Sequence, residues 1–496
     1  MTVRRPPVAV AATGASLLLA ALSTAFVNAL SYDAWGWLIW GQEIAGGHPF
    51  TTNGYPTWKP LTALVAVALS PLGHAAPFLW LMVARASAVI ALVLAYRLAS
   101  RLAGRAAGVL AALALLIVPD WLFQTGVGGS EPLVTALLLG AVARHADRDD
   151  LGAFVLVLLA SLLRPESWAL LVASAVVAWG RSPRSRPVVA LSAMAVPVLW
   201  FGGDYLGSGD PFRGSQLAKT TQEAMRLRHL WALPGVGVLH AASRMIPLSL
   251  LAAVPAALAW GVRRRDPIVL ALGLGSLVWL AEVAALAQLG YAGVTRFLFP
   301  AAAGLSVVGA AGLVQVLRAA RVNPPAQIAL GAVAVALAVP AVLNAHSLRP
   351  VPQHIEERSD LDGAVSTIVA REGAQTLLAA PHLAAQGQTV TPLAWRLDVA
   401  PQSLDKPRFP GLALADTNQR WRLYRAAIRR GRGHFTRRRV TSAWALTLIA
   451  VDRRPPRSSR GSHTGAFQRP RGERAPVPRP RERQSDAPPG GLAFQP

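Results

Sequence analysis

Long apolar stretches separated by short polar turns occupy the first 345 residues of the chain. The first stretch, residues 8–30, follows Arg4 and Arg5 and is long enough to cross ~30 Å of bilayer hydrocarbon as a helix. A basic start and an apolar core also fit a signal peptide, but more such stretches follow, so we predict an uncleaved first helix. Ten further candidate spans follow it: 78–97, 106–123, 131–145, 151–163, 167–180, 187–201, 245–261, 267–289, 297–318 and 325–345. The pattern predicts an α-helical polytopic membrane protein with about 11 transmembrane helices.

Two neighbouring stretches are short for membrane spans. Residues 151–163 and 167–180 each fall below the ~20 residues that a helix needs to cross a bilayer, and LLRPESW joins them. A single kinked helix there would carry the arginines of 181–186 to the opposite side of the membrane. We therefore predict two short helices that meet at Pro165.

Arginines mark one side of the predicted membrane domain. When the spans are joined in order, fifteen arginines fall on one side: Arg4, Arg5, Arg97, Arg101, Arg105, Arg144, Arg148, Arg181, Arg184, Arg186, Arg263, Arg264, Arg265, Arg318 and Arg321. Basic residues accumulate on the cytoplasmic side of membrane proteins. We therefore expect a multi-pass plasma-membrane protein with a cytoplasmic N-terminus and an extracytoplasmic C-terminal part.

Composition excludes several classes of protein. The chain is 53% hydrophobic and 15% charged, which does not fit an ordinary soluble domain. Its net charge of +24 could indicate a nucleic-acid partner, but the arginines lie mostly beside apolar segments, so we expect none. The absence of cysteine from the sequence excludes disulfides, thiol catalysis and cysteine-ligated metals. The Arg-, Ala- and Gly-rich usage is typical of GC-rich bacterial genomes.

The pattern changes after residue 346. Apolar stretches shorten to strand length (AQTLLAA, LAWRLDV and SAWALTLIAVD) around a predicted helix at 415–431. We therefore predict a membrane domain over 1–345 and a small extracytoplasmic α/β domain over 346–452. Residues 453–496 carry ten arginines among Pro, Ser and Gly and are predicted to be a disordered basic tail.

The first candidate for chemistry follows the first span, in SYDAWGWLIWGQEIAGGHPF. Asp33 heads a predicted interfacial helix, with Trp37 and Trp40 on the same face at i+4 and i+7. A carboxylate at an apolar boundary is a stronger base than one in water. The alternative is that Asp33 only caps the helix.

Other charged residues lie at predicted membrane entries on the same side. Lys59 in TWKPL and Arg296 in VTRFLFP could bind a phosphate, or could reach the interface only to keep their charge in water. Glu131 lies in GGSEPL, a segment that resembles a helix start, where an acidic residue complements the helix dipole. Arg164 and Glu166 flank Pro165 and either pair with each other or bind substrate.

Motifs of other enzyme classes are absent from the sequence. His48 is a lone histidine in a glycine-rich loop, and we predict no histidine metal site. There is no Walker loop, GxSxG elbow, HExxH pair or nucleotide fingerprint, so a pump driven by ATP is not expected.

The motifs together resemble the GT-C superfamily of polyprenyl-phosphate-dependent membrane glycosyltransferases. The resemblance is carried by YDAWGWLIWGQEIAGGHPF, PDWLFQTGVGGSEPL, LLRPESWALL and RFLFP, and PLAWRLDV is similar to the soluble C-terminal domains of such enzymes. It implies that Asp33 is, or positions, the base that deprotonates an acceptor hydroxyl. It also implies a polyprenyl-phosphate sugar donor, attacked outside the cytosol, usually with inversion. Many relatives have a paired acidic motif where this chain has Asp33-Ala34, which leaves the use of a divalent metal open; no other cofactor is expected.

Glycosyl transfer also fits the charged residues on chemical grounds. It needs a base on one side of the sugar and cations beside the leaving phosphate, and Asp33, Arg296 and Lys59 supply these groups. We therefore predict transfer of a sugar to an envelope glycan, lipid or protein, with Glu131, Arg164, Glu166 and Trp37 as further substrate-binding residues. Two alternatives stay open. A transporter of a lipid-linked or anionic envelope precursor would use Arg85 and Glu282 near the membrane midplane, and a non-catalytic scaffold would bind glycan through its exported domain.

Overall fold

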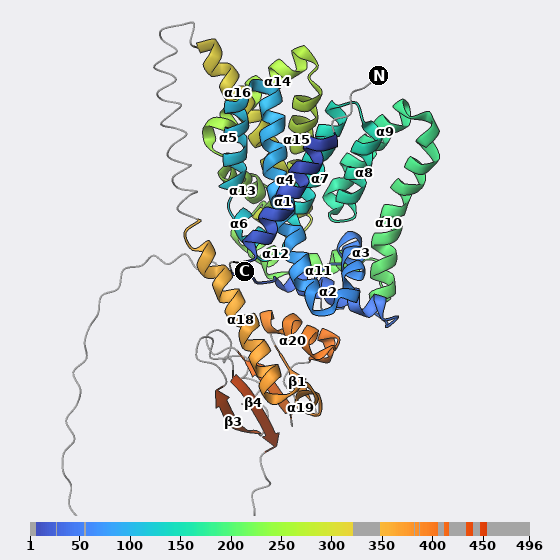
Figure 1. The fold of residues 1–496 in the computed structure, drawn as a ribbon, viewed down its shortest axis with the longest axis vertical. Coiled ribbons are helices and arrows are strands. Elements are labelled where there is room, and N and C mark those ends of the chain that lie inside the picture. The colour runs from blue at the N-terminus through green and yellow to red at the C-terminus, as the bar shows by residue number, and fades with distance from the viewer. Residues whose placement is uncertain are drawn as a thin grey trace, which may run out of the picture. The chain divides into compact units, whose positions relative to one another are not determined.

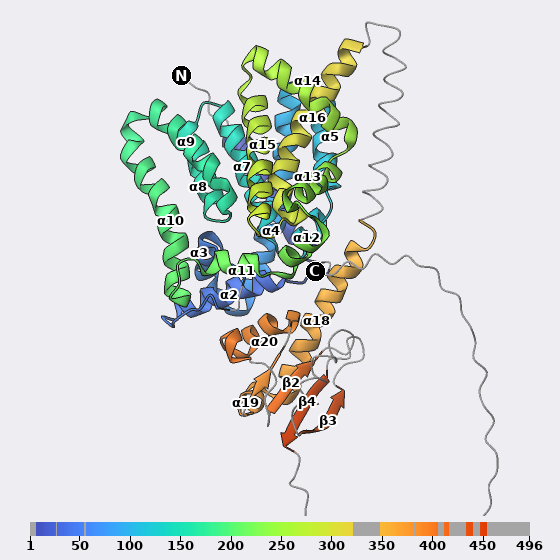
Figure 2. The ribbon, with the colours of Figure 1, turned by 180° about the vertical axis from the view of Figure 1, so that it is seen from behind.

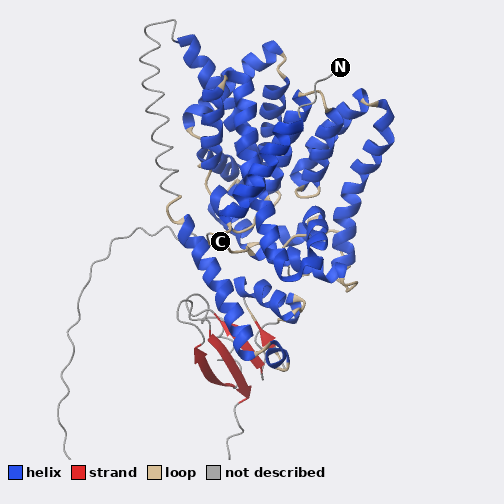
Figure 3. Cartoon of the chain, viewed as in Figure 1, coloured by secondary structure: helices blue, strands red, loops and turns tan. Residues whose placement is uncertain are grey.

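The computed structural model is mainly helical, with a small sheet near the C-terminus (Figure 3). It describes residues 6–25, 27–53, 56–320, 348–380, 382–385, 387–404, 411–415, 433–439 and 447–453. The predicted span 325–345 lies outside these residues, as do the predicted helix 415–431 and the predicted tail 453–496 except for the first residue of each.

Sixteen α-helices precede residue 321 among the described residues (Figure 1). They are α1 Pro6–Ser23, α2 Tyr32–Ala45, α3 Pro60–Leu69, α4 Ala76–Ala103, α5 Arg105–Leu116, α6 Trp121–Gly126, α7 Glu131–Ala146, α8 Asp150–Ser161, α9 Trp168–Arg181, α10 Arg186–Ser208, α11 Arg213–Lys219, α12 Gln222–Leu230, α13 Pro234–Met245, α14 Leu248–Arg264, α15 Pro267–Gln288 and α16 Phe299–Ala320. Short 3₁₀ turns cover Ser70–Ala75, Pro165–Ser167, Pro183–Ser185 and Thr295–Leu298.

Several of these helices have membrane length. Within the described residues, four stretches are long and apolar enough to cross a bilayer: Pro60–Ala103, Pro183–Ser208, Pro267–Gln288 and Thr295–Ala319. A fifth would be added if α13 and α14, which meet at 99°, formed one broken span. The chain is thus a multi-pass membrane protein, while the predicted total of about 11 spans stays a prediction.

Helix α16 forms the centre of the bundle. It packs against α4, α5, α7, α14 and α15, and its residues from Phe299 to Val314 are almost all buried. Small residues allow this close approach: a Cβ added to Gly309 would lie 2.4 Å from the Leu250 carbonyl oxygen, and one added to Gly312 would lie 2.5 Å from that of Ala253.

The predicted break at Pro165 is confirmed. Helices α8 and α9 are separate and short, and the 3₁₀ turn Pro165–Ser167 joins them. Between the first two predicted spans the chain contains α2, as predicted, and also the apolar α3, which was not predicted from the sequence.

Helix α1 ends at Ser23, earlier than the predicted residue 30, and Arg85 of α4 donates hydrogen bonds to backbone carbonyls at and after this end. Arg85 Nη1 donates to the Ser23 carbonyl oxygen (2.8 Å), and Arg85 Nη2 donates to that of Val27 (2.9 Å). The last carbonyls of a helix lack partners inside the helix and carry partial negative charge, so a buried cation suits this position.

The ends of the bundle differ. The α9–α10 and α14–α15 turns, which carry predicted cytoplasmic arginines, lie at one end, while α2, α3 and α11 lie at the other (Figures 1 and 2). Candidate site residues therefore belong to the end that we predict to be extracytoplasmic.

The C-terminal segment contains helices and a four-stranded sheet. The helices are α18 Val351–Glu372, α19 Ala374–Leu378 and α20 Val390–Leu397, and the strands are β1 Leu383–Ala384, β2 Gly411–Ala415, β3 Gly433–Arg439 and β4 Thr447–Arg453. The order is β1-β2-β4-β3, with β1 parallel to β2 and the other pairs antiparallel.

Two predicted strands in this segment are helices instead. AQTLLAA contains α19, and LAWRLDV lies mostly in α20. In LAWRLDV the apolar residues fit both a period of two and helical spacing, and in the structure this stretch forms a helix that buries Leu393, Ala394 and Leu397. The third predicted strand, SAWALTLIAVD, overlaps β4.

Candidate active site

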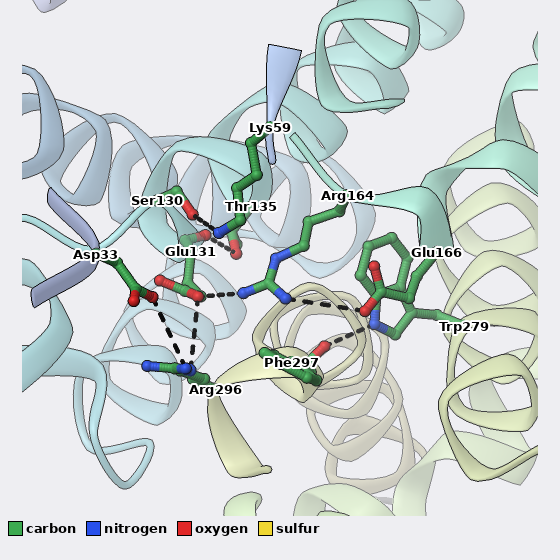
Figure 4. A network of polar contacts seen from close by, with 10 residues as sticks. All are labelled: Asp33, Lys59, Ser130, Glu131, Thr135, Arg164, Glu166, Trp279, Arg296 and Phe297. Atoms are coloured by element: carbon green, nitrogen blue, oxygen red, sulfur yellow. Dashed lines mark hydrogen bonds and ion pairs between the residues drawn. The ribbon is translucent and has the colours of Figure 1, made fainter. Parts of the chain in front are cut away.

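Asp33 lies in the first turn of α2 but does not cap it. The N-cap is Ser31, whose Oγ accepts a hydrogen bond from the Ala34 backbone nitrogen at 3.2 Å. The capping role considered for Asp33 is therefore filled by another residue, and the Asp33 carboxylate points toward Arg296 (Figure 4).

Arg296 links Asp33 to Glu131. Its Nη2 lies 3.9 Å from Asp33 Oδ2, and its Nε lies 3.9 Å from Glu131 Oε1. The neighbouring Thr295 donates to Asp120 Oδ2 at 2.6 Å, which ties the start of this 3₁₀ turn to the residue before α6. Asp120 itself has a left-handed backbone (φ 65°), so the residue that accepts this hydrogen bond lies in a tight turn.

A second arginine lies behind this pair. Arg164 donates to Glu131 Oε1, and its Nη1 lies 3.8 Å from Glu166 Oε1. Its guanidinium also lies over the Phe297 ring, 4.2 Å from the ring centre. Trp279 Nε1 in turn donates a hydrogen bond to the Phe297 carbonyl oxygen at 2.8 Å (Figure 4). Arg164 therefore pairs with Glu131 as well as with Glu166.

Lys59 completes the cluster. Its Nζ donates to Ser130 Oγ at 2.9 Å and lies 4.6 Å from the centre of the Trp37 ring. Burial, and then the nearby positive charge of Arg164, lower the pKa of the Lys59 ammonium to about 8.

The turn before α7 brings the first helices together. Ser31 donates its backbone N–H to the Val127 carbonyl (2.8 Å), and Trp80 Nε1 donates to that of Gly128 (2.8 Å). Gly128 has φ +74°, and an added Cβ would lie 2.9 Å from Leu30 Cδ2. A side chain at position 128 would therefore strain the backbone and clash with the Leu30 side chain just before α2.

The cluster holds three carboxylates and three cations with unequal exposure. Lys59, Glu131, Arg164 and Glu166 are buried. In contrast, the side chains of Arg296 and Asp33 keep 33% and 29% of their surface exposed. A ligand that reaches this cluster would therefore meet Asp33 and Arg296 first.

All seven residues that we predicted for the site share this cluster: Asp33, Trp37, Lys59, Glu131, Arg164, Glu166 and Arg296. Glu43 and His48, also on the predicted exported side, follow later in α2 and in the loop after it. Sequence reasoning missed Ser130 and Phe297, although each stands beside a predicted residue in the chain. Within the described residues, no group of three or more His, Cys, Asp or Glu side chains could hold a metal ion.

Comparison with solved structures identifies the architecture. The structure of ArnT from Cupriavidus metallidurans bound to undecaprenyl phosphate matches with a TM-score of 0.51 and 14% sequence identity, over 93% of this chain and 100% of ArnT. The chain therefore has the same fold as ArnT. An oligosaccharyltransferase from Archaeoglobus fulgidus is also similar, with a TM-score of 0.44 and 13% identity over 85% of this chain and 73% of that one. No protein-family model matches the sequence, and a search of curated proteins found no match.

Proposed function

We propose that the protein is a membrane glycosyltransferase. It moves a sugar from a polyprenyl phosphate to an envelope glycan, lipid or protein on the extracytoplasmic face, and it acts with inversion. The observation that carries this proposal is the pair formed by Asp33 and Arg296, a partly exposed base beside a partly exposed cation, backed by buried cations.

The pair fits the two ends of the reaction. Asp33 accepts the proton of the acceptor hydroxyl, and the acceptor oxygen forms a bond with the anomeric carbon of the donor sugar. The bond between that carbon and the phosphate oxygen breaks, and the polyprenyl phosphate leaves with the electron pair. Arg296, with Lys59 behind it, stabilises the negative charge that develops on the phosphate. The proton ends on Asp33.

The buried members of the cluster support substrate binding. Arg164 holds Glu131, which in turn orients Arg296 through the contact at 3.9 Å. Glu166 Oε2 is buried and has no hydrogen-bond partner among the residues described, so it is available to accept a bond from a sugar hydroxyl. The indole of Trp37 offers an apolar face beside Lys59.

The geometry of Arg85 weighs against the transporter. That alternative requires Arg85 as a midplane binding group, yet Arg85 is buried and donates to carbonyls at the end of α1. The fold also favours the transferase, since ArnT shares it and was solved with undecaprenyl phosphate.

Sugar transfer by the purified chain tests this function. The full chain in detergent would be offered a panel of radiolabelled polyprenyl-phosphate sugars with membrane glycan, lipid and peptide acceptors. We expect one donor to give labelled acceptor and free polyprenyl phosphate in equal amounts. Absence of transfer from a panel that covers the pentoses and hexoses, by protein that binds a polyprenyl phosphate, would contradict the proposal.

A further inference from the structure

Helices α18 and α20 of the C-terminal segment pack against the start of α2. The rings of Trp35 and Trp395 lie 5.8 Å apart between centroids, and the Arg396 guanidinium lies over the Trp35 ring at 5.2 Å. Leu361 of α18 belongs to the same buried cluster as Trp35 and Trp395. The contact is a packed apolar interface with charged residues inside it.

Asp362 is the polar centre of this interface. Its Oδ2 accepts from the Leu30 backbone nitrogen at 3.5 Å and from Trp35 Nε1 at 3.4 Å. These donors stand on either side of Asp33 in the chain. One carboxylate from α18 therefore contacts both flanks of the proposed base.

The face of α18 that carries Asp362 is fixed at a second point. Ile355, Arg358 and Asp362 recur at helical spacing on this face. A Cβ added to Gly126 of α6 would lie 2.4 Å from Ile355 Cδ1, so Ile355 occupies the space that this glycine leaves. Arg358 donates to Gln388 Oε1, and the negative charges of Asp362 and Asp33 both act on it.

We propose that Asp362 is a positioning residue, which holds Leu30 and Trp35 and thereby keeps the Asp33 carboxylate beside Arg296. This inference rests on the proposed role of Asp33. It gives the C-terminal segment a part in the reaction that does not require contact with the donor.

The role needs an acceptor atom rather than a full charge. Burial raises the pKa of Asp362 to about 6, although the charges of Arg396 and Arg358 and the hydrogen bonds from Leu30 and Trp35 oppose the rise. A neutral side chain with a carbonyl oxygen in the same place therefore keeps the contact. Asp362→Asn should preserve the positioning, and Asp362→Ala should abolish it.

Kinetics provide the first test. We expect Asp362→Ala to lower kcat by about tenfold to a hundredfold, since small displacements of a reacting group have effects of this order. The KM for the donor should stay unchanged, and Asp362→Asn should restore most of kcat. The matched control is Asp360→Ala, because Asp360 is exposed on the same helix. A wild-type kcat in Asp362→Ala, or an Asn variant as slow as the Ala variant, would overturn the proposal.

A distance measurement provides a test that is independent of activity. The sequence has no cysteine, so spin labels can be placed at Ala45→Cys of α2 and Thr367→Cys of α18, both exposed positions. We expect Asp362→Ala to broaden the distribution of distances between the labels and Asp362→Asn to leave it narrow. If neither the wild type nor any variant transferred sugar, the proposed function would fail. The label distances would still show whether Asp362 holds α2 against α18. A narrow distribution in Asp362→Ala would refute the positioning role.

Discussion

The charge on a single residue, Lys59, should set the alkaline limit of activity. Its ammonium is buried against Trp37, and its pKa is lowered to about 8, so the positive charge is lost as the pH rises through that value. We expect kcat/KM for the donor to fall above about pH 8, because a neutral amine does not stabilise a phosphate.

In the variant Lys59→Arg, the fall in kcat/KM should move to higher pH, because arginine stays protonated. The measurement is a pH profile of kcat/KM for wild type and variant under the same conditions. If kcat/KM of Lys59→Arg still fell above about pH 8, the titration of a group other than Lys59 would cause the fall.

At the residue scale, the site could be predicted from sequence because charged side chains at membrane entries are costly and therefore few. This rule selected Asp33, Lys59 and Arg296. It could not show that Arg164 pairs with Glu131 as well as Glu166, since that contact joins residues 33 positions apart in the chain. It also could not find Asp362, whose partner Leu30 is 332 positions away.

Among the elements, the junction between α1 and α4 depends on one side chain. Replacing Arg85 by Met leaves the carbonyls of Ser23 and Val27 without their donor, which should destabilise the protein by about 2–3 kcal/mol. Thermal unfolding in detergent measures the effect. The control is Arg97→Met, because Arg97 is exposed on the same helix. Equal stability of the Arg85 variant and the control would contradict the capping role.

The helices themselves were largely predictable, and the short C-terminal elements were not. Long apolar stretches such as 267–289 have only one stable form in a bilayer, so pattern alone defined α15. LAWRLDV is seven residues long and fits two periods. Its packing against α2 and α18, through Trp395 and Leu393, is tertiary information that local sequence does not contain.

For the molecule as a whole, the contact between α18 and α2 should depend on pH. Because the folded pKa of Asp362 is raised to about 6, its contribution to stability is complete below about pH 4 and is lost as the pH rises through about 6. Asp362→Asn carries no such charge. Its melting temperature should therefore match wild type near pH 4 and exceed it near pH 7, while Asp360→Asn should track wild type throughout. A wild type that is more stable than Asp362→Asn at pH 7 would contradict this sign.

The predicted orientation of the chain, which rests on the distribution of its arginines, can be tested by labelling. Because the sequence lacks cysteine, Thr367→Cys and Arg184→Cys each provide one reactive thiol at an exposed position. A maleimide that cannot cross membranes should label Thr367→Cys in intact cells and Arg184→Cys only after permeabilisation. The reverse pattern would place the proposed site in the cytosol.

The most direct measurement is sugar transfer by Asp33→Asn beside wild type. The matched control is Glu43→Gln, because Glu43 is a half-buried carboxylate on the same helix outside the cluster. We predict that Asp33→Asn binds the polyprenyl-phosphate donor as wild type does but loses at least about a hundredfold in kcat, as expected for removal of a general base. Glu43→Gln should transfer at the wild-type rate. Equal transfer by Asp33→Asn and wild type would contradict the assignment of Asp33 as the base.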